Sequence, residues 1–344
     1  MKRSFSIIIV TWNGLHHLKN YLSSVVATNY SNFEIIIADN SSTDGSVEWV
    51  QKHYPNCIIA SFDKNFGYAG GNNRAVQFAT GEVIIFLNND VKPDSDWLQH
   101  LNDSMNETQT DIIQPKIKSL NNPEYFEYAG AAGGFIDWLG YPFCKGRLFE
   151  HLEMDLGQYD QSDKIFWASG AAFTIKRELF LEMGGFDEKF QFHMEEIDLS
   201  WRAHRLGKSI YYSPKSVVYH LGAGSLSESS ALKTYYNYRN SLFMLTKNIE
   251  KYLLLKIIFR LTLDGFAGIR FLFKGLPKHT VAILKAHFSY YSNLKDVLKS
   301  RKSLKKIQSM SQYRDLIYPK LILMDYFIKQ KKTFNELINF PNNR

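Results

Sequence analysis

The sequence is poor in cysteine and has no long apolar run free of charge. It contains two cysteines, Cys57 and Cys144, among 344 residues. They are too few for a disulfide framework or a cysteine-rich metal site, and they suit a reducing compartment. No uncharged apolar run approaches the roughly 18 residues of a membrane-spanning helix. The apolar residues 5–10 give way to polar residues without the small-residue cleavage site of a signal peptide. We therefore expect a cytoplasmic location.

Two classes of motif are also missing. No G-x-G-x-x-G follows the first predicted strand, which argues against a dinucleotide-dependent redox enzyme. The stacking and zinc motifs of nucleic-acid-binding modules are not evident either. We expect no nucleic-acid partner.

The chain is basic, and the excess of positive charge lies towards its C-terminal end. The formal net charge is +7, the pI is about 9.1, and Lys and Arg crowd residues 247–332. With 45% hydrophobic and 15% aromatic residues, the chain can bury a large core. The charge favours acidic partners, here phosphorylated substrates or an anionic membrane surface.

The first 120 residues alternate between strand and helix patterns. Strands are predicted over residues 5–10, 34–39, 57–61, 83–88 and 112–118, and helices over residues 15–26, 46–53, 69–79 and 96–105. This alternation predicts βαβ units, a mostly parallel sheet and helices on both of its faces. Later strands are predicted over residues 166–175, 209–213 and 217–220, and later helices over residues 178–183 and 195–206.

Two segments do not follow this alternation. Residues 121–146 lose their periodicity and are rich in Gly, Ala and aromatic residues, which predicts an irregular connection close to substrate or a mobile loop.

Residues 252–274 form a helix pattern with a polar stripe on an otherwise apolar surface. The stripe consists of Lys256, Arg260, Asp264, Arg270 and Lys274. Such a helix either lies in a membrane interface or packs on the preceding domain.

A polar cluster follows the predicted strand over residues 83–88. Residues two apart on a strand point the same way, so Asn88 and Asp90 share a face. The carboxyl ends of strands are where open α/β sheets bind ligands, and Mg²⁺ prefers oxygen ligands together with substrate phosphates. The pattern indicates a metal-diphosphate site, with a simple turn as the alternative.

The loops after the first three strands carry further candidates. Asp39 is placed to accept hydrogen bonds from a nucleobase or ribose. Gly70 and Gly71 would let backbone N–H groups approach a phosphate, and Arg74 would add positive charge. Turn and N-cap chemistry is the alternative for residues 39–45.

Taken in order, these segments resemble family 2 glycosyltransferases, which have the GT-A fold. The matching stretches are residues 6–13, 36–46, 65–73, 87–90, 167–172, 184–188, 195–202 and His220. Each motif is weak alone, whereas the ordered set over residues 4–245 is specific. The resemblance is closest to the rhamnosyltransferase-like branch that builds bacterial surface polysaccharides. It implies a GT-A catalytic domain over residues 1–246, with a nucleotide-sugar half (1–120) and an acceptor half (121–246). A basic helical region over residues 247–344 follows.

The resemblance implies a donor site and a divalent metal, Mg²⁺ or Mn²⁺. The donor-binding residues would be Thr11, Asn13, Asp39, Asn40, Ser42, Asp44, Asn65, Gly67, Gly70, Gly71, Asn72, Arg74, Asn88 and Asn89. Asp90 would be the retained acid of the family's D-x-D motif, with Asn88 in place of the first acid. His220 matches a histidine that ligates the metal in some relatives.

The resemblance also implies the catalytic group. Glu195, Glu196 and Asp198 match the acidic motif that supplies the family's base, with Glu196 in the position of the base and Glu195 as its rival. A carboxylate must take the proton of the attacking hydroxyl, and a like-charged neighbour would raise its pKa. The alternative is an acidic helix start favoured by the helix dipole.

Acceptor contacts are expected from Trp167, Ser169, Gly170, Arg202 and Arg239. For Asp198 and Arg202 the alternative is hydrogen bonding within their own helix. For Arg239, in the stretch Tyr235–Asn240, the alternative is a salt bridge inside a packed aromatic helix.

The sequence therefore predicts an inverting, metal-dependent glycosyltransferase acting at the cytoplasmic face of a membrane. It would move a sugar from a UDP- or dTDP-sugar to a lipid-linked or oligosaccharide acceptor in cell-surface polysaccharide synthesis. One alternative is a sugar-nucleotide nucleotidyltransferase, although residues 11–18 lack the Gly-rich basic signature of that class. A non-catalytic sugar-nucleotide-binding module is the other.

Overall fold

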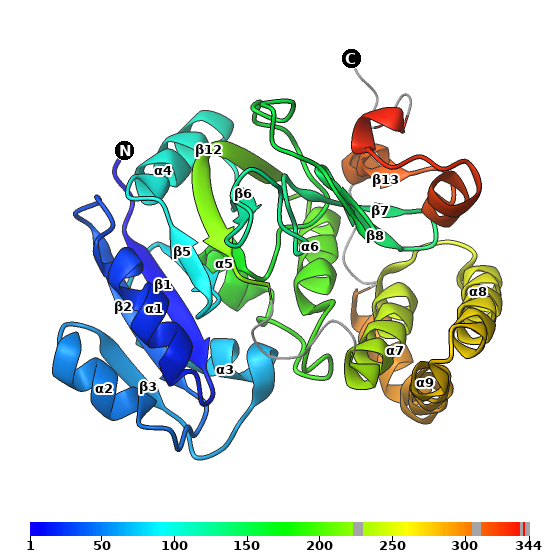
Figure 1. The fold of residues 1–344 in the computed structure, drawn as a ribbon, viewed down its shortest axis with the longest axis horizontal. Helices are drawn as coiled ribbons and strands as arrows, with labels where there is room; N and C mark the ends of the chain where they lie inside the picture. The colour runs from blue at the N-terminus through cyan, green and yellow to red at the C-terminus, as the bar shows by residue number, and fades with distance from the viewer. Residues whose placement is uncertain (223–229, 305–310, 338–339, 341–344) are drawn as a thin grey trace.

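An eight-stranded mixed sheet forms the centre of the molecule (Figure 1). The structure is a computed structural model that describes residues 1–222, 230–304, 311–337 and 340. The strand order is β3-β2-β1-β4-β11-β6-β12-β5. Its strands are β1 (Phe5–Thr11), β2 (Phe33–Asp39), β3 (Ile58–Ser61), β4 (Val83–Leu87), β5 (Val91–Pro93), β6 (Ile112–Ser119), β11 (Ala172–Lys176) and β12 (Ile210–His220).

The N-terminal half of this sheet has the predicted βαβ arrangement. Strands β1 to β4 pair in parallel, and their strand-to-helix loops meet at one edge. The helices that follow these strands are α1 (Leu15–Val26), α2 (Ser46–His53), α3 (Gly67–Ala75) and α4 (Trp97–Thr108). The loops expected to carry function therefore lie side by side.

Both faces of the sheet are buried, as a parallel sheet requires. Ile7 and Ile9 of β1 face a core that includes Leu18 of α1 and Trp97 of α4. Ile8 faces the opposite core, which continues into the rest of the molecule. Strand alternation explains this division, because successive side chains point to opposite faces.

Two strand predictions were wrong in their extent. β11 begins at Ala172 rather than at residue 166, because residues 166 and 167 bond to Gly134 in another part of the chain. The strands predicted over residues 209–213 and 217–220 are one strand, β12, whose register shifts between Ser213 and Val217.

Residues 121–146, predicted to be irregular, contribute to a second sheet of order β10-β9-β8-β7-β13. Its strands are β7 (Gly134–Asp137), β8 (Pro142–Cys144), β9 (Arg147–Leu148), β10 (His151–Leu152) and β13 (Ile317–Tyr318). The strands are short, and β7 pairs with β13 from near the C-terminus. A local pattern does not reveal such a distant partner.

Helices complete the molecule. These are α5 (Arg177–Glu182), α6 (Glu195–Arg205), α7 (Ala231–Asn248), α8 (Leu253–Phe273) and α9 (Pro277–Leu304). α7 packs against α6, α8 and α9. In the described part of the chain, none of the helices has both the length and the apolarity that a membrane span requires.

Candidate active site

The end of β4 brings Asp90, Asn88 and His220 together. β5 pairs with the end of β12, so His220 lies opposite Val91. His220 Nε2 is 3.1 Å from Asp90 Oδ1 and 3.3 Å from Asn88 Nδ2. Asp90 and His220 are both buried. The three residues that the resemblance assigned to a metal are therefore neighbours in space.

A fourth residue of this cluster, Glu127, was not predicted. Glu127 Oε2 lies 3.2 Å from His220 Nδ1. Burial alone would lower the pKa of His220, but Glu127 and Asp90 raise it, to about 10. Glu127 comes from the segment 121–146 and has no local motif, so only the folded chain reveals it.

The cluster offers oxygen ligands for a divalent metal but not a complete coordination shell. In the residues that the structure describes, no three acidic, His or Cys side chains converge on one point. The carboxylate of Asp90 and the amide oxygen of Asn88 are donor types that suit Mg²⁺ or Mn²⁺. His220 would have to lose its ring proton before Nε2 could bind a metal. Glu127 is placed to hold the other ring nitrogen, as carboxylates commonly do beside metal-bound histidines.

The first two donor loops are joined by hydrogen bonds between the predicted residues. The backbone N–H of Asn13 donates to Ser42 Oγ at 2.8 Å, and that of Leu15 donates to Asp44 Oδ2 at 2.9 Å. Asp39 is buried and accepts from the N–H of Ser42. The turn chemistry is therefore present and fixes the two loops against each other, whereas the N-cap residues Gly14 and Gly45 provide no side-chain cap.

Other donor candidates lie in the same region. Asn89 Nδ2 donates to Thr11 Oγ1 at 3.3 Å, which joins the β4 end to the β1 end. Asn40 Nδ2 donates to the carbonyl of Gly67 at 3.0 Å. Asn65 Oδ1 accepts from the N–H of Gly67.

The glycines of α3 serve close packing. A Cβ on Gly71 would lie 2.9 Å from Asn40 Nδ2, and one on Gly70 would lie 2.9 Å from Phe66 Cβ. Asn72 is buried and donates to the carbonyl of Tyr68. Arg74 forms an ion pair with Glu188 at 2.9 Å. These contacts give the predicted phosphate-binding segment a structural function of its own.

Glu195 and Glu196 begin α6, and each has one carboxylate oxygen without a partner. The Oε2 atoms of both residues are buried and make no hydrogen bond within the described structure. Burial raises the pKa of both groups, to about 7 for Glu196, and the charge of Glu196 further raises that of Glu195. Two buried like charges cannot both ionise easily, so the pair favours holding one proton.

The loop before this pair is held by α7. Gln191, His193 and Met194 all have positive φ, a conformation that needs support in residues other than glycine. Asn240 Nδ2 donates to the carbonyls of Phe190, Phe192 and His193 at 2.7–2.9 Å.

Arg239 supports the same loop by donating to the carbonyls of Lys189 and Phe190. It is buried and also donates to Asn240 Oδ1. These contacts agree with the alternative of a packed helix, and the expected acceptor contact of Arg239 stays a prediction. Its partners are carbonyl oxygens rather than a carboxylate.

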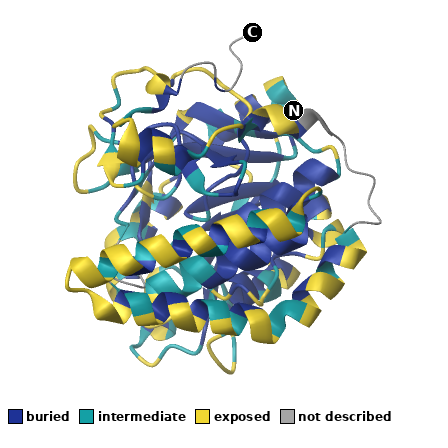
Figure 2. Ribbon diagram, turned by 90° about the vertical axis from the view of Figure 1, so that its right-hand side faces the viewer, coloured by how far each residue is buried: buried dark blue, intermediate teal, exposed yellow. Residues whose placement is uncertain are grey.

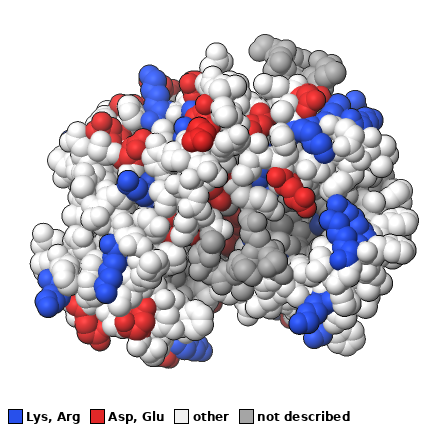
Figure 3. Space-filling view, in the orientation of Figure 1, with Lys and Arg blue, Asp and Glu red and all other residues white. Residues whose placement is uncertain are grey.

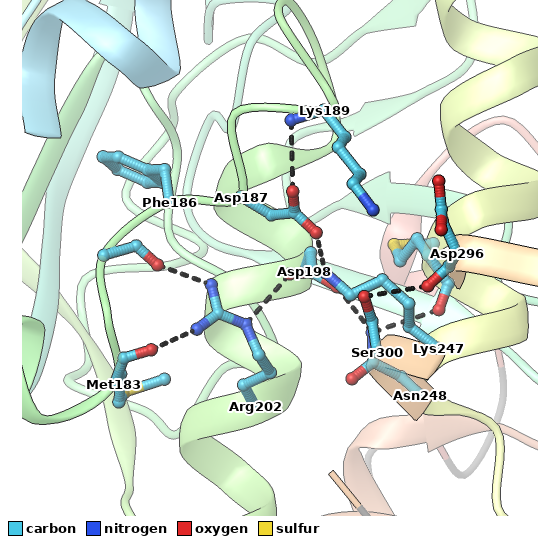
Figure 4. Close-up of polar contacts among 12 residues, drawn as sticks. Met183, Phe186, Asp187, Lys189, Asp198, Arg202, Lys247, Asn248, Asp296 and Ser300 are labelled. Atoms are coloured by element: carbon cyan, nitrogen blue, oxygen red, sulfur yellow. Dashed lines mark hydrogen bonds and ion pairs between the residues drawn. The ribbon is translucent and has the colours of Figure 1, made fainter. Parts of the chain in front are cut away.

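Asp198 and Arg202 form a buried network with α7 (Figure 4). Arg202 Nε lies 2.9 Å and Lys247 Nζ 2.8 Å from Asp198 Oδ2. Asn248 donates to the other oxygen of Asp198 at 2.8 Å. Although burial alone would raise the pKa of Asp198, Lys247 and Arg202 lower it. This geometry favours the helix-internal alternative for Asp198 and Arg202, and it fixes α6 on α7.

The stretch 167–172 connects the two parts of the site. Trp167 and Ser169 are buried, and Trp167 Nε1 donates to the carbonyl of Phe135. The carbonyl of Gly170 accepts from Tyr68 Oη at 2.7 Å. Burial and the charges of Glu195 and Glu196 raise the pKa of Tyr68. On the other side, the N–H of Asn88 donates to Ala171.

The stretch 167–172 is therefore bonded both to Tyr68 and to Asn88. Figure 3 shows acidic side chains inside a hollow near the centre of the same face as Figure 1, next to α6. Tyr68, which was not predicted, donates to the carbonyl of Gly170. In the sequence, Tyr68 could have been found only from its position within the matching stretch 65–73.

Comparison with known sequences identifies relatives of this chain. Residues 6–183 match the sequence model of glycosyl transferase family 2. An N-acetylglucosaminyl-diphospho-decaprenol L-rhamnosyltransferase of Mycobacterium tuberculosis is 26% identical over 250 residues, covering 65% of this chain and 78% of its own length. The O-antigen biosynthesis protein RfbC of Myxococcus xanthus is 28% identical over 211 residues, covering 59% of this chain but 16% of its own length.

Solved structures show the same fold. GalNAc-T7, crystallised with UDP, GalNAc and Mn²⁺, has a TM-score of 0.52 at 20% identity, covering 63% of this chain and 43% of its own. The mannosyltransferase PcManGT of Pyrobaculum calidifontis, in complex with GDP-Man and Mn²⁺, has a TM-score of 0.51 at 14% identity, covering 89% and 86%. The predicted family and the predicted GT-A fold are confirmed.

Proposed function

Because this chain belongs to glycosyl transferase family 2, we propose that it transfers a sugar from a nucleoside-diphospho-sugar with inversion at the anomeric carbon. The acceptor would be a hydroxyl group of a lipid-linked glycan. The observation that carries this proposal is the pair Glu195 and Glu196, whose buried Oε2 atoms have no hydrogen-bond partner in the described structure. An unpartnered carboxylate oxygen is what a base for a hydroxyl group needs.

Glu196 is the base in this proposal. Burial raises its pKa to about 7, close to the neutral pH at which a general base is most effective. It is also less buried than Glu195. The acceptor oxygen loses its proton to Glu196 and bonds to the anomeric carbon. The bond from that carbon to the diphosphate oxygen breaks, and the nucleoside diphosphate leaves.

The donor would bind along the edge formed by the first four strands. Asp39, Asp44 and Asn13 would face the nucleoside of a UDP- or dTDP-sugar. Asp90, Asn88 and His220 would hold Mg²⁺ or Mn²⁺ at the diphosphate. The metal would offset the negative charge that develops on the leaving group.

A lipid-linked acceptor is supported by one relative and by the surface of the chain. The Mycobacterium tuberculosis relative is named as a transferase acting on a decaprenol-linked sugar. The long helices α8 and α9 expose many apolar side chains. We therefore propose that the enzyme works at the cytoplasmic face of a membrane, bound peripherally.

A transfer assay tests the proposal. The full chain would be incubated with UDP- and dTDP-sugars, Mn²⁺ and a short polyprenyl-diphosphate-linked sugar, and the product would be analysed by NMR. We expect a glycosidic bond whose anomeric configuration is opposite to that of the donor. Retention of configuration would contradict the proposed base. Release of pyrophosphate from a nucleoside triphosphate and a sugar phosphate would instead indicate a nucleotidyltransferase, and binding without turnover a non-catalytic module.

A further inference from the structure

Three of the five residues of the polar stripe of helix α8 face the protein. Lys256 Nζ donates to the carbonyl of Trp138 at 2.6 Å. Arg260 is buried, forms an ion pair with Asp264 at 3.1 Å and stacks on the ring of Tyr141. These three residues belong to the stripe for which the sequence left open a membrane interface or packing on the preceding domain. In the structure they attach the helix to the protein.

The opposite side of α8 is apolar and open. Leu254 is 75% exposed and Phe273 is 89% exposed. The exposed large apolar side chains of this helix are Leu254, Leu255, Ile258, Phe259, Phe266, Ile269, Leu272 and Phe273. They recur every three to four residues, which puts them on one face. Soluble proteins rarely leave so continuous an apolar face open, and such a face usually marks an interaction surface.

Helix α9 continues this surface. Val281, Leu284, Phe288 and Tyr291 are exposed at spacings of three and four, so they too share one face. Thr280 Oγ1 donates to the carbonyl of Gly268 at 2.8 Å, which joins α9 closely to α8. Figure 2 shows the two long helices exposed on this side of the molecule. We call the exposed apolar side chains of α8 and α9 the helical face.

The charges near the helical face are almost all positive. Residues 251–304 are all described, and they expose eight cationic side chains against one acidic side chain, Asp296. The cations are Lys251, Arg270, Lys274, Lys278, Lys285, Lys295, Lys299 and Lys302. Figure 3 shows Lys and Arg over the right-hand region where α8 and α9 lie.

We propose that the helical face binds the surface of an anionic phospholipid bilayer. The apolar side chains enter the boundary between headgroups and acyl chains, and the lysines contact lipid phosphates. This inference rests on the proposed function in one respect, since a lipid-linked acceptor must be met at a membrane. Helix α7 connects the helical face to the proposed active site, because it packs on α8 and α9 and also holds the loop before Glu195.

The charge distribution favours lipid over a second copy of this chain. Two copies meeting through the helical face would bring eight cations of one against eight of the other. Like charges facing one another across an interface oppose association. An anionic bilayer offers the opposite charge together with an apolar interior, so it matches both features of the face.

Flotation with vesicles tests the inference. The full chain would be mixed with vesicles of phosphatidylcholine alone or of phosphatidylcholine with phosphatidylglycerol. We expect it to float with the anionic vesicles, and less so at high salt. Phe273→Ser should weaken binding about tenfold, because it removes one exposed aromatic anchor. The double variant Lys278→Glu and Lys285→Glu should weaken it on anionic vesicles.

Leu156→Gln is the matched control, because Leu156 is 78% exposed on another part of the surface. It should float like the unchanged protein. Equal flotation of Phe273→Ser and Leu156→Gln would overturn the inference. A dimer in light scattering that depends on Phe273, without flotation, would also overturn it.

Thermal stabilisation by UDP- and dTDP-sugars with Mn²⁺ separates this inference from the proposed function. Phe273→Ser should retain that stabilisation, because the helical face takes no part in donor binding. Stabilisation without flotation defeats the membrane inference alone. Flotation without stabilisation by any of these donors defeats the proposed donor site alone.

Discussion

At the scale of single residues, the site is defined by carboxyl groups whose environments differ. Asp198 is buried among cations, and their charges lower its pKa. Glu195 and Glu196 are buried beside each other, and their pKa values are raised. The sequence shows all three acids within one helical turn. It does not show that Lys247, far along the chain, neutralises the third.

The first prediction concerns stability and pH. The pKa of Glu196 is raised from 4.5 to about 7 on folding. A group with a raised pKa lowers the free energy of unfolding at every pH above the pKa that it has in the unfolded chain. The loss of stability grows until the pH passes about 7. Glu196→Gln should therefore raise the free energy of unfolding at pH 8, by on the order of 1 kcal/mol. At pH 4 the gain should vanish. Denaturant unfolding at both pH values measures it, and a gain of equal size at both would contradict the assignment.

The second prediction concerns Asp90. Removing its charge should weaken metal-dependent binding of the donor nucleotide by at least about tenfold, since a hard cation needs an anionic ligand. Calorimetric titration of UDP in the presence of Mn²⁺ would compare Asp90→Asn with Asp94→Asn. Asp94 is a nearby exposed carboxylate and serves as the control. If both variants bind as the unchanged protein does, the metal site lies elsewhere.

At the scale of elements, strand ends were predictable and long-range partners were not. The apolar runs of β1, β2 and β4 and the polar residues after them are visible in the sequence, so the donor loops could be located. Glu127 reaches His220 because the segment that carries it folds back against β6. The sequence around Glu127 contains no pattern that predicts this contact. The second sheet was missed because its strands are only two to four residues long, which is too short for a clear alternating pattern.

The third prediction concerns α7 as the support of the loop before Glu195. Asn240→Asp preserves shape and the acceptor for Arg239 but replaces the amide donor that meets three carbonyls. The loop should shift, and kcat should fall about tenfold or more, because small displacements of a catalytic group are costly. The KM for the donor should stay the same.

Thr234→Val is the control for this prediction, since Thr234 lies on the same helix but contacts His279 of α9. It should keep kcat. A rise of donor KM in Asn240→Asp with kcat unchanged would show that Asn240 serves donor binding instead.

At the scale of the whole molecule, the C-terminal chain completes the core of the catalytic part. β13 joins the second sheet. Phe334 lies 5.1 Å from Phe135 and 6.1 Å from Phe143 between ring centroids. The sequence suggested a boundary near residue 247 from a change in composition, and composition does not report which residues pack together.

The fourth prediction follows from this packing. Phe334 is 3% exposed, so Phe334→Ala should lower the free energy of unfolding by about 3 kcal/mol. Phe327→Ala, at a partly exposed position of the same C-terminal segment, should cost much less. Thermal unfolding of both variants measures the difference, and equal losses would show that the C-terminal segment does not cover the core.

The most direct test of the proposed chemistry is the transfer rate of Glu196→Gln beside that of Glu195→Gln. We predict that the unchanged enzyme gains activity as the pH rises through about 7, where Glu196 loses its proton. Glu196→Gln should lose almost all transfer while staying folded and still binding the donor. Glu195→Gln should keep measurable transfer. Full transfer by Glu196→Gln, at any pH, would contradict the account.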